Sequence, residues 1–196
     1  MQYLRLMAAA TLAVTGLSCG LFEPRQAEAP TQPGLDFQPA LDPASVISNL
    51  IAAVGQKSET NYIRCFTDPT TSTRTFTFTP SSEGVAVYGS IFANWGRSEE
   101  LNYFRNLHAR SGPTAYSNLQ LTEKSAPSIT ADSVVYYYDY VFQFEHSDKT
   151  FPTTAQGSLI FTVVPDNSGL WAIYRWVDLK TTSAISWSMF KGKFSS

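Results

Sequence analysis

The sequence predicts an α+β domain in which N-terminal helices pack on a curved antiparallel sheet. Apolar residues recur at helical spacing between residues 46 and 54, as in an amphipathic helix with one buried face. Apolar and polar residues instead alternate through most of residues 117–180, as in strands that bury one side. Helical segments followed by a run of strands form the element order of an α+β domain.

The first two helices have recognisable starts. Pro43 and Ser45 precede the apolar positions 46–54, and proline suits the first turn of a helix, where a missing N–H is not needed. Ser58 is placed to cap a second, shorter helix over residues 58–66, because a serine hydroxyl accepts a hydrogen bond from the free N–H groups of a first turn.

A short strand and a third helix are expected next. Threonine and phenylalanine alternate in RTFTFTP, residues 74–80, which predicts a strand ended by Pro80. A helix is expected from about Ser90 to Arg110. Glu99 and Glu100 would lie in an early turn of this helix, where the helix dipole favours negative charge.

The C-terminal part is predicted to be a meander of antiparallel strands. Pro127, Pro152 and the turn sequence at 166–169 stand in the expected connections. The following segment, SWSMFKGKF, is expected to form a helical turn or an additional edge strand, with its KGKF end in solvent. The expected strands are Ser117–Lys124, Ser133–Glu145, Thr154–Val164 and Leu170–Lys180.

Asp139 interrupts an aromatic strand, VVYYYDYVFQF, residues 134–144. Because side chains alternate along a strand, Asp139 belongs to the mixed face and Tyr138 and Tyr140 to the apolar one. We therefore expect Asp139 to be solvated or paired with a base such as Arg175. The catalytic alternative needs Asp139 inside the sheet's concave side with a raised pKa beside a tyrosine, which the alternation opposes.

The element order and the ending LWAIYRWVDLKTTSAISWSMFKGKF resemble the nuclear transport factor 2-like (SnoaL-like) superfamily, over about residues 45–196. The tail pattern W-x-I-x-R-W-x-D followed by S-W is similar to that of uncharacterised bacterial lipoproteins. The resemblance implies a sheet curved around helices, a conical pocket and a sheet face that often forms dimers. Ketosteroid isomerases, scytalone dehydratase, polyketide cyclases and envelope proteins without known activity share this fold, so fold alone does not decide function.

The N-terminus resembles a bacterial lipoprotein signal peptide. Arg5 precedes an apolar run at 6–17, which is too short to span a bilayer. The following Gly16-Leu17-Ser18-Cys19 is similar to a lipobox, although its leucine stands one position late. Residues 1–18 are thus predicted to be removed and Cys19 to carry acyl chains such as palmitate, which would hold the protein on a membrane. The alternative is simple secretion, with cleavage after residues 27–29.

This interpretation divides the chain into a signal peptide, a tether and a folded domain, and it predicts where the protein is located in the cell. Residues 19–43 are rich in proline and are predicted to be a semi-extended tether, and residues 44–196 the folded domain. The absence of aspartate at Gly20 implies, by resemblance to such lipoproteins, the outer membrane of the cell envelope.

The aromatic content indicates either a packed core or an apolar pocket. The chain has 10 Tyr, 13 Phe and 4 Trp, and tyrosine and tryptophan suit a pocket with a polar rim. The residues expected to line such a pocket are Trp95, Tyr138, Tyr140 and Trp176.

Other chemistry has little support in the sequence. We expect no catalytic residue, no metal site and no cofactor. His108 and His146 lack partners at ligand spacing, and Cys65 is expected to be a buried small hydrophobe. A formal net charge of −2 argues against nucleic acid as a partner.

The sequence therefore predicts a membrane-anchored envelope lipoprotein that acts as a non-catalytic binding or assembly module. Its partner would be a small apolar ligand, an envelope protein, or a second copy bound through the sheet face. The alternative is a small isomerase, dehydratase or cyclase acting on an apolar substrate in the cone, which requires an acidic residue inside the pocket.

Overall fold

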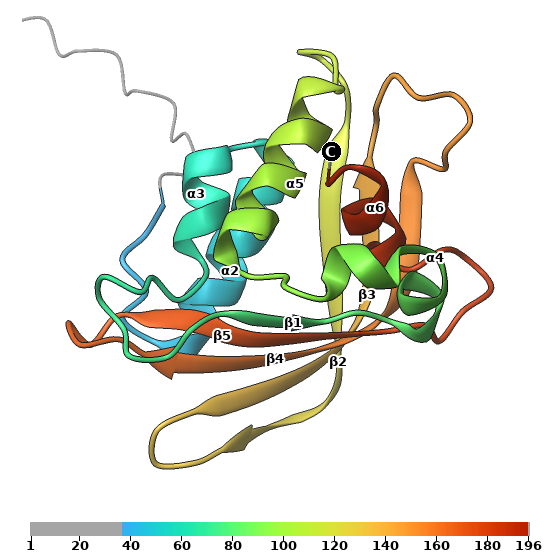
Figure 1. Ribbon diagram of the computed structural model, residues 1–196. Helices are drawn as coiled ribbons and strands as arrows, with labels where there is room; N and C mark the ends of the chain where they lie inside the picture. The colour runs from blue at the N-terminus through green and yellow to red at the C-terminus, as the bar shows by residue number, and fades with distance from the viewer. Residues whose placement is uncertain (1–36, 196) are drawn as a thin grey trace, which may run out of the picture. The chain divides into compact units, whose positions relative to one another are not determined.

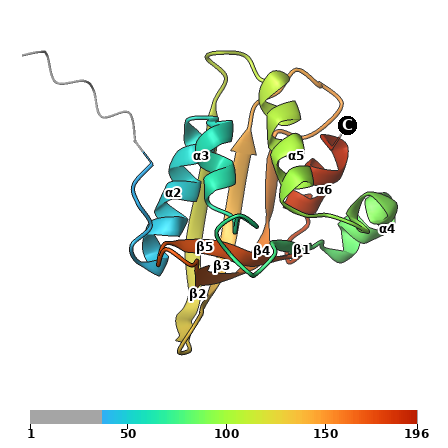
Figure 2. The same cartoon turned by 60° about the vertical axis from the view of Figure 1, so that its left-hand side comes forward.

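In the part of the chain that the structure describes, five strands form one sheet, and the helices α2, α3, α5 and α6 lie on one side of it (Figures 1 and 2). The computed structural model describes residues 37–195, which belong to one compact unit. The strands are β1 (Thr77–Thr79), β2 (Ser117–Ile129), β3 (Val134–Phe144), β4 (Thr154–Pro165) and β5 (Trp171–Leu179). The helices are α2 (Pro43–Gly55), α3 (Glu59–Arg64), α4 (Ser82–Phe92), α5 (Arg97–Ala109) and α6 (Trp187–Lys193).

The strands lie in the order β1-β5-β4-β3-β2. The four long strands form an antiparallel meander, and β1 joins its edge parallel to β5, with Thr77 opposite Arg175. The sheet is therefore mixed, and the predicted α+β class with helices packed on a curved sheet is confirmed.

The first two helices begin as predicted. The Asp42 carboxylate accepts a hydrogen bond of 2.9 Å from the Ser45 N–H at the start of α2, and Pro43 occupies the first turn. The Ser58 hydroxyl accepts one of 3.3 Å from the Asn61 N–H at the start of α3. These caps satisfy N–H groups that have no partner within the helix.

The single helix expected from Ser90 to Arg110 is wrong, because two helices occupy this region. The first is α4, which begins at Ser82, and the second is α5, which begins at Arg97. Gly96 separates them, and its N–H donates a hydrogen bond of 3.0 Å to the Glu99 carboxylate. This return contact from the third residue of α5 fixes the start of a new helix.

Strand β2 also differs from the expectation, since it continues past Lys124 to Ile129. Its pairing with β3 shifts between Glu123 and Ser128, and Pro127 lies within these irregularities. At a bulge in an edge strand a residue without an N–H breaks no ladder bond, so Pro127 lies inside the strand rather than in a connection.

The alternation predicted for β5 is wrong in its first half. Thr162 pairs with Arg175 and Val163 with Ile173, so Tyr174 is an extra residue in the ladder. A bulge of this kind resets which side chains face inward. As a result Ile173 and Trp176, which strict alternation places on opposite faces, are both buried.

The segment SWSMFKGKF contains the helix α6, which agrees with the helical alternative. The expectation that its KGKF end lies in solvent is wrong, because Lys191 is 0% exposed. Trp187, Phe190 and Phe194 are fully buried with it. The last helix is thus part of the core.

Residues 37–42 pack on the domain, although the expected tether runs to residue 43. The Trp171 N–H donates a hydrogen bond of 2.8 Å to the Ala40 carbonyl, and the Arg64 guanidinium lies 3.9 Å from the centre of the Phe37 ring. Cys19 and the predicted signal peptide lie outside the described residues. Within residues 37–195, no helix combines the length and apolar character that crossing a bilayer requires.

Candidate functional site

The concave side of the sheet is filled by side chains of the chain itself. Lys191 of α6 reaches into it and forms a fully buried ion pair with Glu100 of α5. The Lys191 ammonium lies 3.6 Å from the centre of a Trp176 ring and 4.2 Å from that of Phe78. Aromatic faces attract a cation, and more strongly where water is excluded. The ammonium is therefore held by one carboxylate and several rings.

Glu100 is buried but well supplied with donors. The Tyr62 hydroxyl donates to its Oε1 at 2.6 Å, and the Trp95 indole N–H donates to its Oε2 at 2.7 Å. A buried carboxylate is tolerated when it is both paired and hydrogen-bonded. Burial lowers the pKa of Lys191 to about 8, against the opposing attraction of Glu100.

A second buried carboxylate, Asp178 of β5, ties α6 to the sheet. It accepts hydrogen bonds from the Tyr140 hydroxyl at 2.8 Å and from the Ser188 N–H at 2.7 Å. The Tyr140 oxygen in turn accepts a hydrogen bond of 2.7 Å from the Trp187 N–H. Burial raises the pKa of Asp178 above its usual value. The first turn of α6 is thus bonded to β3 and β5 from inside the cone.

All four residues expected to line a pocket are buried. Trp95 and Trp176 surround the Lys191 ammonium, and Tyr140 is bonded to Asp178. Tyr138 stacks on Tyr136, with ring centres 5.7 Å apart. Trp95, Tyr140 and Trp176 thus contact α6, whereas Tyr138 packs on its neighbour in β3.

Asp139 lies on the other side of the sheet, as predicted from the strand alternation. It pairs with Lys124 of β2 at 3.2 Å, not with Arg175, which lies level with Val135, four residues away along β3. Hydrogen bonding to Ser158 lowers the pKa of Asp139, and Lys124 adds to this effect. The carboxylate is therefore charged at neutral pH, and it is partly solvated.

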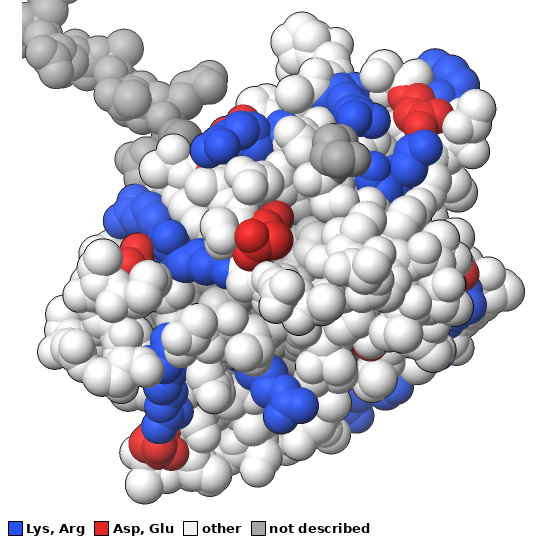
Figure 3. All heavy atoms as spheres, viewed as in Figure 1, with Lys and Arg blue, Asp and Glu red and all other residues white. Residues whose placement is uncertain are grey.

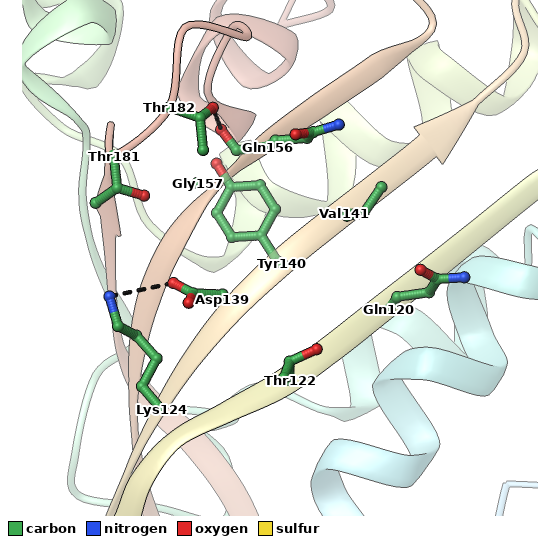
Figure 4. A pocket seen from close by; sticks show the side chains of 10 residues that line it. All are labelled: Gln120, Thr122, Lys124, Asp139, Tyr140, Val141, Gln156, Gly157, Thr181 and Thr182. Atoms are coloured by element: carbon green, nitrogen blue, oxygen red, sulfur yellow. Dashed lines mark hydrogen bonds and ion pairs between the residues drawn. The ribbon is translucent and has the colours of Figure 1, made fainter.

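Asp139 and Lys124 border a cavity of about 370 Å³, which we call the sheet-face groove (Figure 4). Its wall on one side is the segment after β5, whose Thr182 hydroxyl donates to the Gln156 carbonyl at 3.3 Å. The lining residues are Gln120, Thr122, Lys124, Asp139, Tyr140, Val141, Gln156, Gly157, Thr181 and Thr182.

Two further surface cavities lie elsewhere. One of about 180 Å³ lies beside Phe37, Arg64 and Arg97, and one of about 430 Å³ lies beside His146 and Lys149. Trp95, Tyr138 and Trp176 border none of these three cavities.

The two histidines and Cys65, which the sequence analysis also considered, each contact other parts of the fold. His108 contacts Glu59 at 2.9 Å, and His146 contacts the Pro152 carbonyl at 3.2 Å. Burial raises the pKa of the Cys65 thiol, which leaves it protonated. No group of three or more potential metal ligands occurs among residues 37–195. Among the described residues on the face shown in Figure 3, basic and acidic side chains are scattered, several as neighbouring pairs of opposite sign.

Sequence reasoning missed the interior charges Glu100, Asp178 and Lys191. Glu100 was predicted only to lie in an early helical turn, and Lys191 was expected in a solvated tail. A usable signal was present, since Lys191 follows Trp187 by four residues and Phe190 by one. On a helix, positions four apart share a face, so Lys191 lies on the face that carries Trp187.

No protein-family model and no curated protein matches the sequence. Solved structures do match. A proposed aromatic ring hydroxylase of Novosphingobium aromaticivorans has a TM-score of 0.56 at 14% identity, over 84% of this chain and 99% of that one. A conserved protein of Planctomyces limnophilus has a TM-score of 0.51 at 12% identity, over 69% and 91% of the two chains.

A ketosteroid isomerase-like protein of Erwinia carotovora atroseptica has a TM-score of 0.50 at 12% identity, over 71% of this chain and 94% of that one. Identities this low carry the fold and not the activity. The chain therefore has the nuclear transport factor 2-like fold that its sequence predicts.

Proposed function

We propose that this protein is a lipid-anchored, non-catalytic binding module of the cell envelope, and that it binds its partner through the outer face of its sheet. The observation that carries this proposal is the filled interior. Lys191 and Glu100 neutralise each other inside the cone, and the helix that brings Lys191 is bonded to the sheet through Asp178 and Tyr140.

Opening the interior is costly. Withdrawal of α6 exposes Trp187 and Phe190, both fully buried, and the burial of one large apolar side chain contributes about 1.5–3 kcal/mol. It also separates the ion pair of Lys191 and leaves Glu100 without its cation, which costs several kcal/mol. A ligand entering the cone has to offset all of these losses.

The outer face offers a partner an apolar row between polar ones. Tyr137, Ile160 and Val177 lie side by side across β3, β4 and β5 and are each partly exposed. Arg175 lies in the row on one side and Asp139 in the row on the other. A second copy of the chain is the simplest partner, because a surface that carries both signs of charge can complement itself in an isologous contact.

The anchor in this proposal is Cys19, followed by the proline-rich residues 20–36. Acyl chains contribute about 0.8 kcal/mol per buried methylene, so a multiply acylated cysteine holds a protein on a membrane without a spanning helix. The tether then keeps the folded unit close to, but not in, the bilayer, with the outer membrane as the expected site.

The test of the anchor uses the full chain in a bacterial host supplied with an alkyne-labelled fatty acid. The expected result is a labelled protein in the membrane fraction, and loss of both label and membrane association in Cys19→Ala. Substitution of Cys65, which is buried in the domain, serves as the matched control and should leave the label in place. An unlabelled wild-type protein would refute the anchor.

The test of the outer face uses a photo-crosslinking amino acid at position 137 in intact cells. A discrete product, at twice the chain's mass for a second copy, is expected there. The same group at Thr114, an exposed loop position, should give none. Equal products at both positions would contradict a specific interface.

A second candidate function, a small isomerase- or cyclase-type enzyme, is favoured by one observation. The buried Asp178 carboxyl has a raised pKa and lies beside the Tyr140 hydroxyl, which is an arrangement suited to acid-base chemistry. Native mass spectrometry of the full chain distinguishes the two. An unliganded mass is expected from the filled cone, whereas a retained apolar molecule that is lost in Asp178→Asn would support the enzyme.

A further inference from the structure

Several side chains that both donate and accept hydrogen bonds line the sheet-face groove. Besides Tyr140, five of its residues carry amide or hydroxyl side chains, namely Gln120, Thr122, Gln156, Thr181 and Thr182. Val141 is the one aliphatic side chain of the lining, and the Tyr140 hydroxyl is bonded inside the cone. A volume of about 370 Å³ lies in the range of small-molecule sites.

A buried serine holds the polar groups of the groove in place. Ser158 of β4 is 3% exposed, and its hydroxyl donates to Asp139 Oδ1 at 2.5 Å. Ser158 Oγ also accepts a hydrogen bond of 3.1 Å from Lys124 Nζ, and it lies 3.0 Å from Thr181 Oγ1. A hydroxyl has one donor and two acceptor positions, so these three contacts use it fully. Side chains from β2, β3 and the segment after β5 are thus fixed before any ligand arrives.

The charges of Asp139 and Lys124 balance, but the two groups still have a donor and an acceptor that a ligand can use. An ammonium has three N–H donors, and Lys124 uses two of them, on Ser158 and Asp139. Asp139 Oδ2 and the side-chain amides of Gln120 and Gln156 bond to no residue within 37–195. Adjacent hydroxyl groups on a ligand match such a carboxylate and ammonium pair, since each hydroxyl both donates and accepts.

Other ligand classes fit this lining less well. Binding of an anion by Lys124 is weakened because Asp139 already neutralises it, and binding of a cation by Asp139 is weakened by Lys124 in the same way. An apolar molecule would cover the hydroxyl and amide groups of the lining without bonding to them, and the apolar row of Tyr137 lies beside the groove rather than in it. A preformed hydrogen-bonding surface whose charges balance suits neutral polyhydroxylated molecules.

We propose that the sheet-face groove binds a neutral oligosaccharide, with Asp139 and Lys124 bonded to adjacent hydroxyls and Gln120 and Gln156 bonded to others. The inference deepens the proposed function and rests on it for one point, that the protein is held beside the polysaccharides of the envelope. Ser158 is a positioning residue in this arrangement, because its hydroxyl orients three of the contacting side chains.

The test is titration of the full chain, purified in a detergent without a sugar headgroup, with maltotriose, cellotriose and N,N′,N″-triacetylchitotriose, followed by saturation-transfer difference NMR. Saturable binding of at least one trisaccharide is expected. Asp139→Asn should weaken it about tenfold or more, because a hydrogen bond to a charged group contributes roughly one to two factors of ten. Gln156→Ala should weaken it as well.

Gln143→Ala is the matched control, since Gln143 lies on the same face of β3 but outside the groove lining. It should bind as the wild type does. Absence of saturable binding by all three trisaccharides overturns the inference, and so does binding that Asp139→Asn leaves unchanged. Failure of the acyl label at Cys19 with intact sugar binding would instead overturn the proposed anchor alone.

Discussion

Replacing Lys191 by methionine is the sharpest perturbation of the filled interior. The methionine side chain is of similar length and keeps the apolar contacts with Trp176 and Phe78, but it removes the cation beside Glu100. Breaking a buried ion pair by removing one partner costs about 3–5 kcal/mol. The hydrogen bonds from Tyr62 and Trp95 remain, so we expect a loss near the lower end, about 3 kcal/mol.

Urea unfolding followed by tryptophan fluorescence measures this loss, because Trp95 and Trp176 both lie beside the Lys191 ammonium. With a denaturant slope of about 1.5–3 kcal/mol per molar, the midpoint should fall by roughly 1–2 M. Lys193→Met is the control. Lys193 is 33% exposed and pairs with Asp148 at the surface, and such pairs contribute about 0–1 kcal/mol.

The double variant Lys191→Met with Glu100→Gln tests the cause. Removing both charges should recover part of the lost stability, because no uncompensated carboxylate is left in the interior. If Lys191→Met alone costs no more than Lys193→Met, the ion pair does not stabilise the closed interior and the reasoning is refuted.

Two further predictions follow from burial. Stability should rise between about pH 8 and pH 10, because folded Lys191, with its pKa lowered to about 8, loses a proton that unfolded lysine keeps. The neutral amine, unlike methionine, still has N–H groups to donate to Glu100. Stability should fall above about pH 10, because Tyr62 and Tyr103 ionise only in the unfolded chain. Urea midpoints measured across this pH range test both the rise and the fall. Lys191→Met should abolish the rise and leave the fall unchanged. Gly157→Ala should cost about 1–3 kcal/mol, since the added Cβ would lie 2.5 Å from the Leu179 carbonyl oxygen. Gly112→Ala, with 3.9 Å to its nearest neighbour, should be close to neutral in the same assay.

The sheet was predictable because its periodicity is strong. Apolar or aromatic residues occupy every second position of β3 from Val134 to Phe144, and the structure buries that face and exposes Asp139. The helix caps at Asp42 and Ser58 follow from local chemistry. Such features depend on neighbours in the sequence, which a reader of the sequence can see.

The interior site depends on contacts between distant residues, which local patterns do not encode. Glu100 and Lys191 are 91 positions apart, and each alone has the properties of a surface charge. The bulge at Tyr174, which turns Trp176 inward together with Ile173, likewise depends on pairing with β4. The four expected pocket residues were recognised as aromatic, but the packing of α6 against Trp95, Tyr140 and Trp176 was not.

The most direct test of the closed interior is native-state hydrogen exchange at the amides of Trp187 and Ser188. These N–H groups bond to Tyr140 and Asp178 inside the cone, so they exchange only when α6 leaves the sheet. We predict that their opening free energy equals the global free energy of unfolding measured in urea. Exchange through an opening several kcal/mol cheaper, with little dependence on urea, would show that α6 opens on its own and would contradict the account.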